Sequence, residues 1–201
     1  MAEIKLCGLR RPLDIVAANG LKPEYIGFVF ARKSKRYVEP EKAMELKQLL
    51  LPDIKAVGVF VNEELSVVAD LLNKGVIDVA QLHGSESEEY VAELKKVTGK
   101  PVIRAFKVAA AEDVESAVKS AADYILLDAG AGDGVTFDWS IVKDVKRPFF
   151  LAGGLGPDNV SDAIKAVHPF AVDVSSGIET DGFKDTDKMT AFVTAVRKEL
   201  S

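Results

Sequence analysis

Short apolar runs alternate with longer amphipathic stretches along the whole chain of 201 residues. Eight runs of four to seven residues are rich in Val, Ile, Leu and Phe, which is typical of parallel strands that are buried on both faces. We predict strands over residues 4–7, 25–30, 56–61, 79–83, 101–107, 124–128, 149–153 and 171–175.

The stretches between the strands carry helical periodicity and recognisable start and stop signals. Pro40 begins one helix and Pro52 ends it, while Asn62 is a candidate N-cap ahead of an acidic first turn. The pattern predicts helices near residues 40–51, 62–75, 85–99, 156–167 and 185–200, and a weaker helical segment at 139–144.

Eight strand–helix units without a leftover segment predict one domain, residues 1–201, folded as a closed (β/α)8 barrel of eight parallel strands. The structural alternative is an open, doubly wound sheet of the same α/β class. No G-x-G-x-x-G motif follows the first strand, and eight complete units are what barrel closure needs. We therefore favour the barrel.

Composition narrows the functional classes. A hydrophobic content of 48% supports a large core, and a mixed net charge of −5 argues against a nucleic-acid surface. The single Cys cannot form an internal disulfide, and one Cys with two His argues against a structural zinc site, so we expect no bound metal. With neither a secretory leader nor an apolar run of bilayer length in the sequence, we expect a cytoplasmic protein that does not bind membranes.

Polar residues gather at the carboxyl ends of the predicted strands, where (β/α)8 barrels carry their active sites. They include Cys7, His83, Lys107 and Asp128. Because alternate side chains of a strand share a face, the pattern also predicts four inward-facing pairs. These pairs are Lys5 with Cys7, Gln81 with His83, Arg104 with Phe106, and Asp173 with Ser175.

The last two strands are each followed by a loop suited to an anion. LAGGLGPDNV places Gly153 and Gly154 after the seventh strand, and DVSSGIE places Ser175, Ser176 and Gly177 after the eighth. Bare backbone N–H groups and hydroxyls in these two consecutive loops form a phosphate site in many such barrels. Tight turns alone would also account for each glycine, but the two loops together favour phosphate binding.

Cys7 and Asp128 form the obvious pair for proton transfer. A thiol needs a nearby cation or dipole to act as a base, and Lys5 is a candidate, whereas an aspartic acid needs burial or a like charge to act as an acid. The structural alternatives are a buried small hydrophobe at Cys7 and a loop-ordering carboxylate at Asp128.

The segment RKSKR at residues 32–36 carries four cations in five positions. It is either a solvated loop or a clamp for a second anionic group, in which Arg36 would grip a carboxylate through two hydrogen bonds. A substrate with a phosphate at one end and a carboxylate at the other would use this segment and the phosphate loops together.

Six motifs in order, KLCGLRRPLD, SKRYV, QLHG, LLDA, LAGGLGPDNV and DVSSGIE, resemble the phosphoribosylanthranilate isomerase family of tryptophan biosynthesis. The resemblance runs from Lys5 to about Glu179. It implies a (β/α)8 barrel and an Amadori rearrangement of N-(5-phosphoribosyl)anthranilate, the expected small-molecule partner, without metal or organic cofactor. A monomer and a homodimer are both compatible with it.

The resemblance also implies roles for individual residues. Cys7 would be the general base and Asp128 the general acid, and Arg36 would hold the anthranilate carboxylate. Asp173 and His83 would contact the ribose or orient the thiol. Residues Gly153, Gly154, Ser175, Ser176 and Gly177 would hold the phosphate.

Two segments depart from the family pattern. Arg10 stands where a threonine is common, and the loop at 129–136 is shorter than the family's glycine-rich version.

Among related sugar-phosphate barrels, the histidine-pathway isomerase would use an aspartate in place of Cys7. Indole-glycerol-phosphate synthase would need a catalytic lysine and an amino-terminal extension. A non-catalytic phosphosugar-binding barrel would not need both Cys7 and Asp128.

Overall fold

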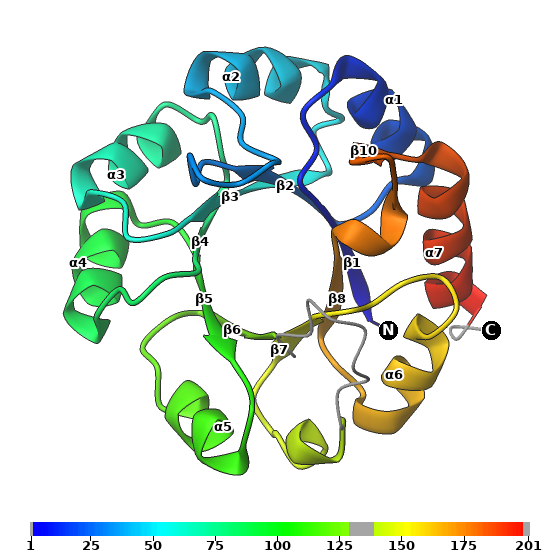
Figure 1. Cartoon of the computed structure of the whole chain (residues 1–201). Coiled ribbons are helices and arrows are strands. Elements are labelled where there is room, and N and C mark those ends of the chain that lie inside the picture. The colour runs from blue at the N-terminus through cyan, green and yellow to red at the C-terminus, as the bar shows by residue number, and fades with distance from the viewer. Residues whose placement is uncertain (1, 129–138, 199–201) are drawn as a thin grey trace.

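The computed structural model describes residues 2–128 and 139–198, and it contains a closed barrel of eight parallel strands paired in chain order (Figure 1). This confirms the predicted fold class, and each strand lies within one residue of its predicted bounds. The strands are β1 (Glu3–Cys7), β2 (Tyr25–Val29), β3 (Lys55–Phe60), β4 (Val79–Leu82), β5 (Val102–Lys107), β6 (Tyr124–Asp128), β7 (Phe149–Ala152) and β8 (Ala171–Val174).

Helices form the outer ring in Figure 1. They are α1 (Pro12–Leu21), α2 (Pro40–Leu49), α3 (Leu65–Asn73), α4 (Glu88–Thr98), α5 (Ala111–Val118), α6 (Val160–Val167) and α7 (Thr186–Lys198). The weakly predicted segment at 139–144 contains a 3₁₀ turn, η1 (Trp139–Val142).

Helices α1 and α5 lack a Ser, Thr or Asn cap, and instead Asp14 and Asp113 accept hydrogen bonds from the backbone N–H groups that precede each helix. Because of that unusual start, the sequence pattern did not delimit them.

The predicted N-cap at Asn62 is wrong. Helix α3 begins after Glu64, and Asn62 adopts a left-handed backbone conformation with a φ of 52°. Its side-chain oxygen accepts hydrogen bonds from the N–H and hydroxyl of Ser85 instead. The amide therefore ties the loop after β3 to the loop after β4.

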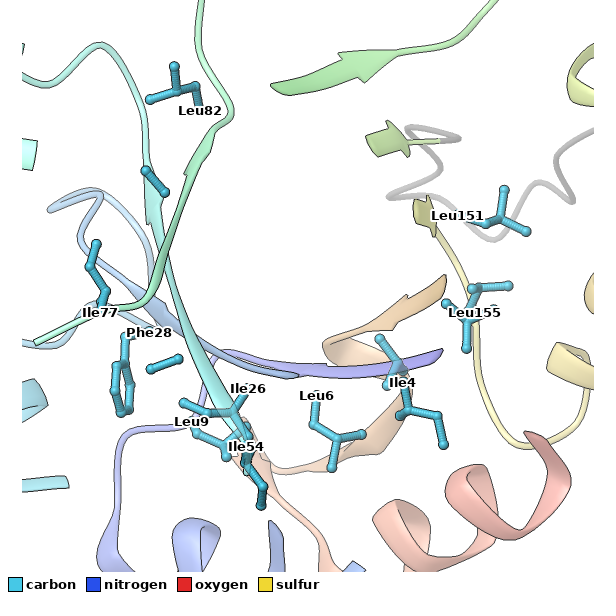
Figure 2. Packing of buried hydrophobic residues seen from close by; sticks show 14 of the residues in the cluster. Ile4, Leu6, Leu9, Ile26, Phe28, Ile54, Ile77, Leu82, Leu151 and Leu155 are labelled. Atoms are coloured by element: carbon cyan, nitrogen blue, oxygen red, sulfur yellow. The ribbon is translucent and has the colours of Figure 1, made fainter. Parts of the chain in front are cut away.

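Side chains divide into an inner and an outer layer. Ile4 and Leu6 project from β1 toward the surrounding helices, and both are fully buried (Figure 2). Inside the barrel, Tyr25, Tyr124, Phe150 and neighbouring apolar residues pack together near the amino ends of the strands, with the Tyr25 and Phe150 rings 5.4 Å apart. This apolar cluster fills the barrel near the amino ends of the strands, so the open end of the barrel is at the carboxyl ends.

The predicted orientation of β5 is wrong. Ile103 and Ala105 belong to the inner cluster, whereas Phe106 packs in the outer layer and Arg104 Nη1 lies 3.1 Å from Glu88 Oε1 on α4. A strand shifted by one residue exchanges its two faces. Here the apolar pair fills the barrel, and the arginine finds its carboxylate on the helix side.

A short hairpin follows β8. The chain makes a 3₁₀ turn, η2 (Ser176–Ile178), and then pairs β9 (Glu179–Thr180) with β10 (Phe183–Lys184) in antiparallel fashion. The sequence pattern did not predict this hairpin, because each strand has only two residues. None of the helices in residues 2–128 and 139–198 is long and apolar enough to cross a membrane.

Candidate active site

One cavity of about 380 Å³ opens at the carboxyl ends of the strands. It brings together every predicted site residue except Gly177. The predicted residues that line it are Cys7, Arg36, His83, Asp128, Gly153, Gly154, Asp173, Ser175 and Ser176. Gln81, Lys107, Ser34 and Leu155 also line the cavity, although no motif in the sequence gave them a role in binding.

Cys7 lies above a buried ion pair that joins the first and last strands. Lys5 Nζ donates to Asp173 Oδ1 at 2.9 Å, and the two residues face each other in the register of β1 and β8. The Lys5 side chain is completely buried. Asp173 therefore contacts the cation next to the thiol.

Gly27 makes room for the thiol. It pairs with Cys7 in the register of β1 and β2, and a Cβ atom at this position would lie 2.6 Å from Cys7 Sγ. Such a contact is far inside van der Waals distance. Nothing in the apolar run YIGFVF pointed to this role, because a glycine inside a strand equally indicates a bulge or a bend.

The environment of Cys7 disfavours its thiolate form. Burial raises the pKa of Cys7, and the charge of Asp173 adds to this effect, while Lys5 and Lys184 oppose it. Burial also acts to lower the pKa of Lys5, but the charge and the hydrogen bond of Asp173 outweigh it, aided by Cys7 when that residue is a thiolate, so the pKa of Lys5 is raised. Lys5 thus stays charged and favours the thiolate, without making it the resting form.

We expect alkylation of Cys7 by iodoacetamide to require a higher pH in the folded protein than in the unfolded chain. The thiolate is the reactive form, and burial raises the pKa of the folded thiol. Rates measured by mass spectrometry across pH 7–10, with and without urea, test this. Because the sequence has one cysteine, each rate reports a single site. A folded profile shifted to lower pH would contradict the expectation.

Asp128, the last residue of β6, lines the same cavity as Cys7 and contacts His83. Asp128 Oδ2 is 3.2 Å from His83 Nε2, and Gln81 Nε2 is 3.0 Å from His83 Nδ1. An amide nitrogen only donates, so Nδ1 accepts and a neutral ring carries its proton on Nε2, toward the carboxylate. His83 therefore contacts the candidate acid, whereas the resemblance implied a ribose contact or a role in orienting the thiol.

The two predicted phosphate loops meet at the cavity. Gly153 and Gly154 have φ values of 92° and 66°, which residues with a Cβ rarely adopt. Asn159 holds their loop, because its side chain accepts from Gly156 N–H at 2.9 Å and donates to Gly154 O at 3.0 Å. A Cβ at Gly177 would lie 2.1 Å from Leu155 O, so this glycine lets the loop after β8 pack on the loop after β7.

Of the four cations in residues 32–36, Arg36 alone lines the cavity; the side chains of Arg32, Lys33 and Lys35 are exposed. Its Nε and Nη2 atoms donate to the two carboxylate oxygens of Glu179, each at 2.7 Å. Lys184 Nζ lies 2.7 Å from Glu179 Oε1. Sequence reasoning missed both partners, and the only available signal was the acidic residue at the end of DVSSGIE.

Arg10, the departure from the family pattern, fastens the hairpin. Its guanidinium donates to the backbone oxygens of Lys35 and Gly182, each at 2.9 Å, and lies 4.9 Å from the centre of the Phe183 ring. It therefore connects the loops that follow β1, β2 and β8. The other departure, the loop at 129–136, lies outside the described residues.

Among the described residues, no group of His, Cys, Asp and Glu is arranged to hold a metal ion. The cavity is lined by one thiol, two carboxylates (Asp128 and Asp173), one histidine, one arginine, one lysine and the two glycine- and serine-bearing loops. A closed (β/α)8 barrel with this set at its carboxyl end defines a class of barrel enzymes that perform acid–base chemistry on phosphorylated substrates.

Within that class, the chain belongs to the N-(5'phosphoribosyl)anthranilate (PRA) isomerase family, whose model matches residues 4–195. The N-(5'-phosphoribosyl)anthranilate isomerase of Clostridium acetobutylicum is 45% identical over 207 residues, covering 98% of this chain and 99% of its own. The chain is therefore an enzyme, an isomerase of tryptophan biosynthesis, as the motifs predicted.

Solved structures agree with this assignment. A phosphoribosyl anthranilate isomerase in complex with reduced 1-(o-carboxyphenylamino)-1-deoxyribulose 5-phosphate has a TM-score of 0.88 and 38% identity, covering 98% of this chain and 100% of its own. Monomers generated from the dimeric isomerase of Thermotoga maritima give the same TM-score, identity and coverage. The fold and the predicted family are thus confirmed together.

Proposed function

We propose that this isomerase converts N-(5-phosphoribosyl)anthranilate to 1-(2-carboxyphenylamino)-1-deoxyribulose 5-phosphate, with Cys7 as general base and Asp128 as general acid. The observation that carries the assignment of roles is that Cys7, at the end of β1, and Asp128, at the end of β6, line one cavity. A related structure with the reduced product bound supports the choice of substrate.

The reaction needs one proton delivered and one removed. Asp128 donates a proton to the furanose ring oxygen while the C1–O bond breaks and the nitrogen lone pair forms a C1=N bond. The Cys7 thiolate then takes the proton from C2, and the electrons of that bond form C1=C2 as the C1=N electrons return to nitrogen. The resulting enolamine tautomerises to the ketone, as its C2 hydroxyl loses a proton and C1 gains one.

The two ends of the substrate bind to different parts of the cavity. The loops that carry Gly153, Gly154, Ser175 and Ser176 supply N–H groups and hydroxyls for the phosphate, and Gly177 shapes the second loop. Arg36 faces the cavity from the loop after β2 and supplies a cation for the anthranilate carboxylate. His83 orients Asp128, and Asp173 holds Lys5 beneath the thiol.

Loss of anthranilate fluorescence during turnover tests the proposal directly. We expect the wild-type protein to turn over N-(5-phosphoribosyl)anthranilate, and inorganic phosphate to inhibit weakly and competitively because it occupies the two glycine loops. The histidine-pathway aldose substrate serves as the control. Absence of turnover with the anthranilate substrate would contradict the proposed reaction.

We also propose that the enzyme acts in the cytoplasm as a monomer or a homodimer. The family's place in amino-acid biosynthesis supports the location. The related enzyme of Thermotoga maritima is described as dimeric, which supports self-association as one of the two states. Light scattering in solution distinguishes a monomer from a homodimer.

A further inference from the structure

The hairpin after β8 places a carboxylate against the cavity's arginine. Glu179, the first residue of β9, accepts from Nε and Nη2 of Arg36 at 2.7 Å each, which is the bidentate geometry of a strong charge-assisted pair. The Glu179 side chain is 10% exposed. Two acceptors in fixed positions determine the plane and the direction of the guanidinium group.

This pairing uses one edge of the guanidinium and leaves another available. Arg36 lines the cavity, whereas Glu179 does not, so the glutamate lies behind the arginine as seen from the substrate. Within residues 2–128 and 139–198, Arg36 Nη1 has no hydrogen-bond partner. A guanidinium can bind a second carboxylate through the Nη1 and Nη2 edge while the Nε and Nη2 edge is occupied.

Lys184 keeps the local charge positive. Its side chain is 2% exposed, and its Nζ atom contacts Glu179 Oε1 at 2.7 Å and Ser175 O at 2.8 Å. Burial acts to raise the pKa of Glu179, but hydrogen bonds and charges from Arg36 and Lys184 lower it to about 2, so the carboxylate is ionised at neutral pH. Burial lowers the pKa of Lys184, and the charge of Glu179 opposes this effect. With Arg36 and Lys184 as cations and Glu179 as an anion, a single positive charge remains beside the cavity.

The hairpin itself is fastened to the rim of the barrel. Arg11 Nη2 donates to Lys184 O at 2.7 Å, and Arg10 Nη2 donates to Gly182 O at 2.9 Å. The guanidinium groups of Arg10 and Arg11 also lie over the Phe183 ring, 4.9 and 4.8 Å from its centre. The position of Glu179 is therefore set by the loop after β1 as well as by its own hairpin.

We propose that Glu179 and Lys184 are positioning residues that hold Arg36 with its Nη1 edge in the cavity and so make the site selective for a substrate bearing a carboxylate. The inference rests on the proposed function, in which Arg36 binds the anthranilate carboxylate. Glu179 takes no part in proton transfer, so its loss should weaken substrate binding far more than it slows chemistry.

Steady-state kinetics of Glu179→Gln test this inference. The glutamine keeps the shape but has a single acceptor oxygen, so it cannot hold both Nε and Nη2. We expect KM to rise about tenfold, the usual scale for losing a partner of a largely buried charged group, while kcat changes less than about threefold. Glu179→Asp keeps the charge but is one methylene shorter, and we expect an intermediate KM.

Two competitive inhibitors separate positioning from general damage. Inhibition by anthranilate, which probes the carboxylate end, should weaken about tenfold in Glu179→Gln. Inhibition by inorganic phosphate, which probes the glycine loops, should stay within about twofold of wild type. Glu45→Gln, which removes the exposed pair of Glu45 with Lys42 on α2, is the matched control and should behave as wild type.

The outcomes are distinct. An unchanged KM in Glu179→Gln, or an equal loss of kcat, anthranilate binding and phosphate binding, would overturn the positioning role. A wild-type protein without turnover would overturn the proposed function, and the inference would fall with it. An active wild type with an unaffected Glu179→Gln variant would overturn only the inference.

Discussion

Replacing Cys7 with serine is expected to lower kcat by about two to four orders of magnitude, the usual contribution of a general base. A serine hydroxyl has a pKa far above that of a thiol, so it supplies almost no anion to take the C2 proton. Serine is similar in size to cysteine and fits the space that Gly27 leaves. The loss should therefore come from chemistry, because the barrel around the residue is unchanged.

Three measurements separate a loss of chemistry from a folding defect. Thermal unfolding of Cys7→Ser should stay close to wild type, its KM should change little, and its kcat should fall. A Cys7→Ser enzyme as fast as wild type would show that another group removes the proton. A large drop in unfolding temperature would instead assign Cys7 the structural role of a buried small hydrophobe.

Asp128→Asn should lower kcat by a similar factor, about two to four orders of magnitude, since an amide has no acidic proton to give the ring oxygen. The asparagine keeps the shape of the side chain and still offers an oxygen to His83 Nε2, which contacts Asp128 at 3.2 Å in the wild type. The geometry of the cavity should therefore survive the substitution.

Asp53→Asn is the matched control, because Asp53 is an exposed residue between α2 and β3, far from the cavity in the fold. It should retain wild-type kcat and KM in the fluorescence assay. If Asp128→Asn also retained full activity, the proton donor would have to be sought elsewhere, and His83 and Lys107 would be the next groups to replace because both line the cavity.

The barrel could be predicted from the sequence because buried parallel strands are easily recognised by their hydrophobic pattern. Each strand is a nearly continuous apolar run, and the rule that active sites lie at the carboxyl ends of the strands selected Cys7, His83 and Asp128 as neighbours. The same signal says nothing about which face of a fully apolar strand points inward. That is why β5 was predicted with Arg104 inside the barrel, whereas its partner Glu88 lies on α4.

The contacts behind the site could not be predicted for a different reason. Glu179 is 143 positions from Arg36 in the chain, and no local pattern connects them. The hairpin that carries Glu179 and Lys184 has two residues in each strand, too few for any periodicity to appear. Such partners follow from how the loops after β2 and β8 converge, which only the folded barrel determines.

The ion pair between Lys5 and Asp173 can form only after the barrel has closed. The two residues are 168 positions apart and meet only when β8 docks beside β1, which is the step that turns an open sheet into a ring. Before that step, Cys7 lacks the charge of Asp173 and the burial that together raise its pKa in the folded barrel. The pKa of the single thiol is therefore expected to differ between a chain in which β8 has not paired with β1 and the closed barrel.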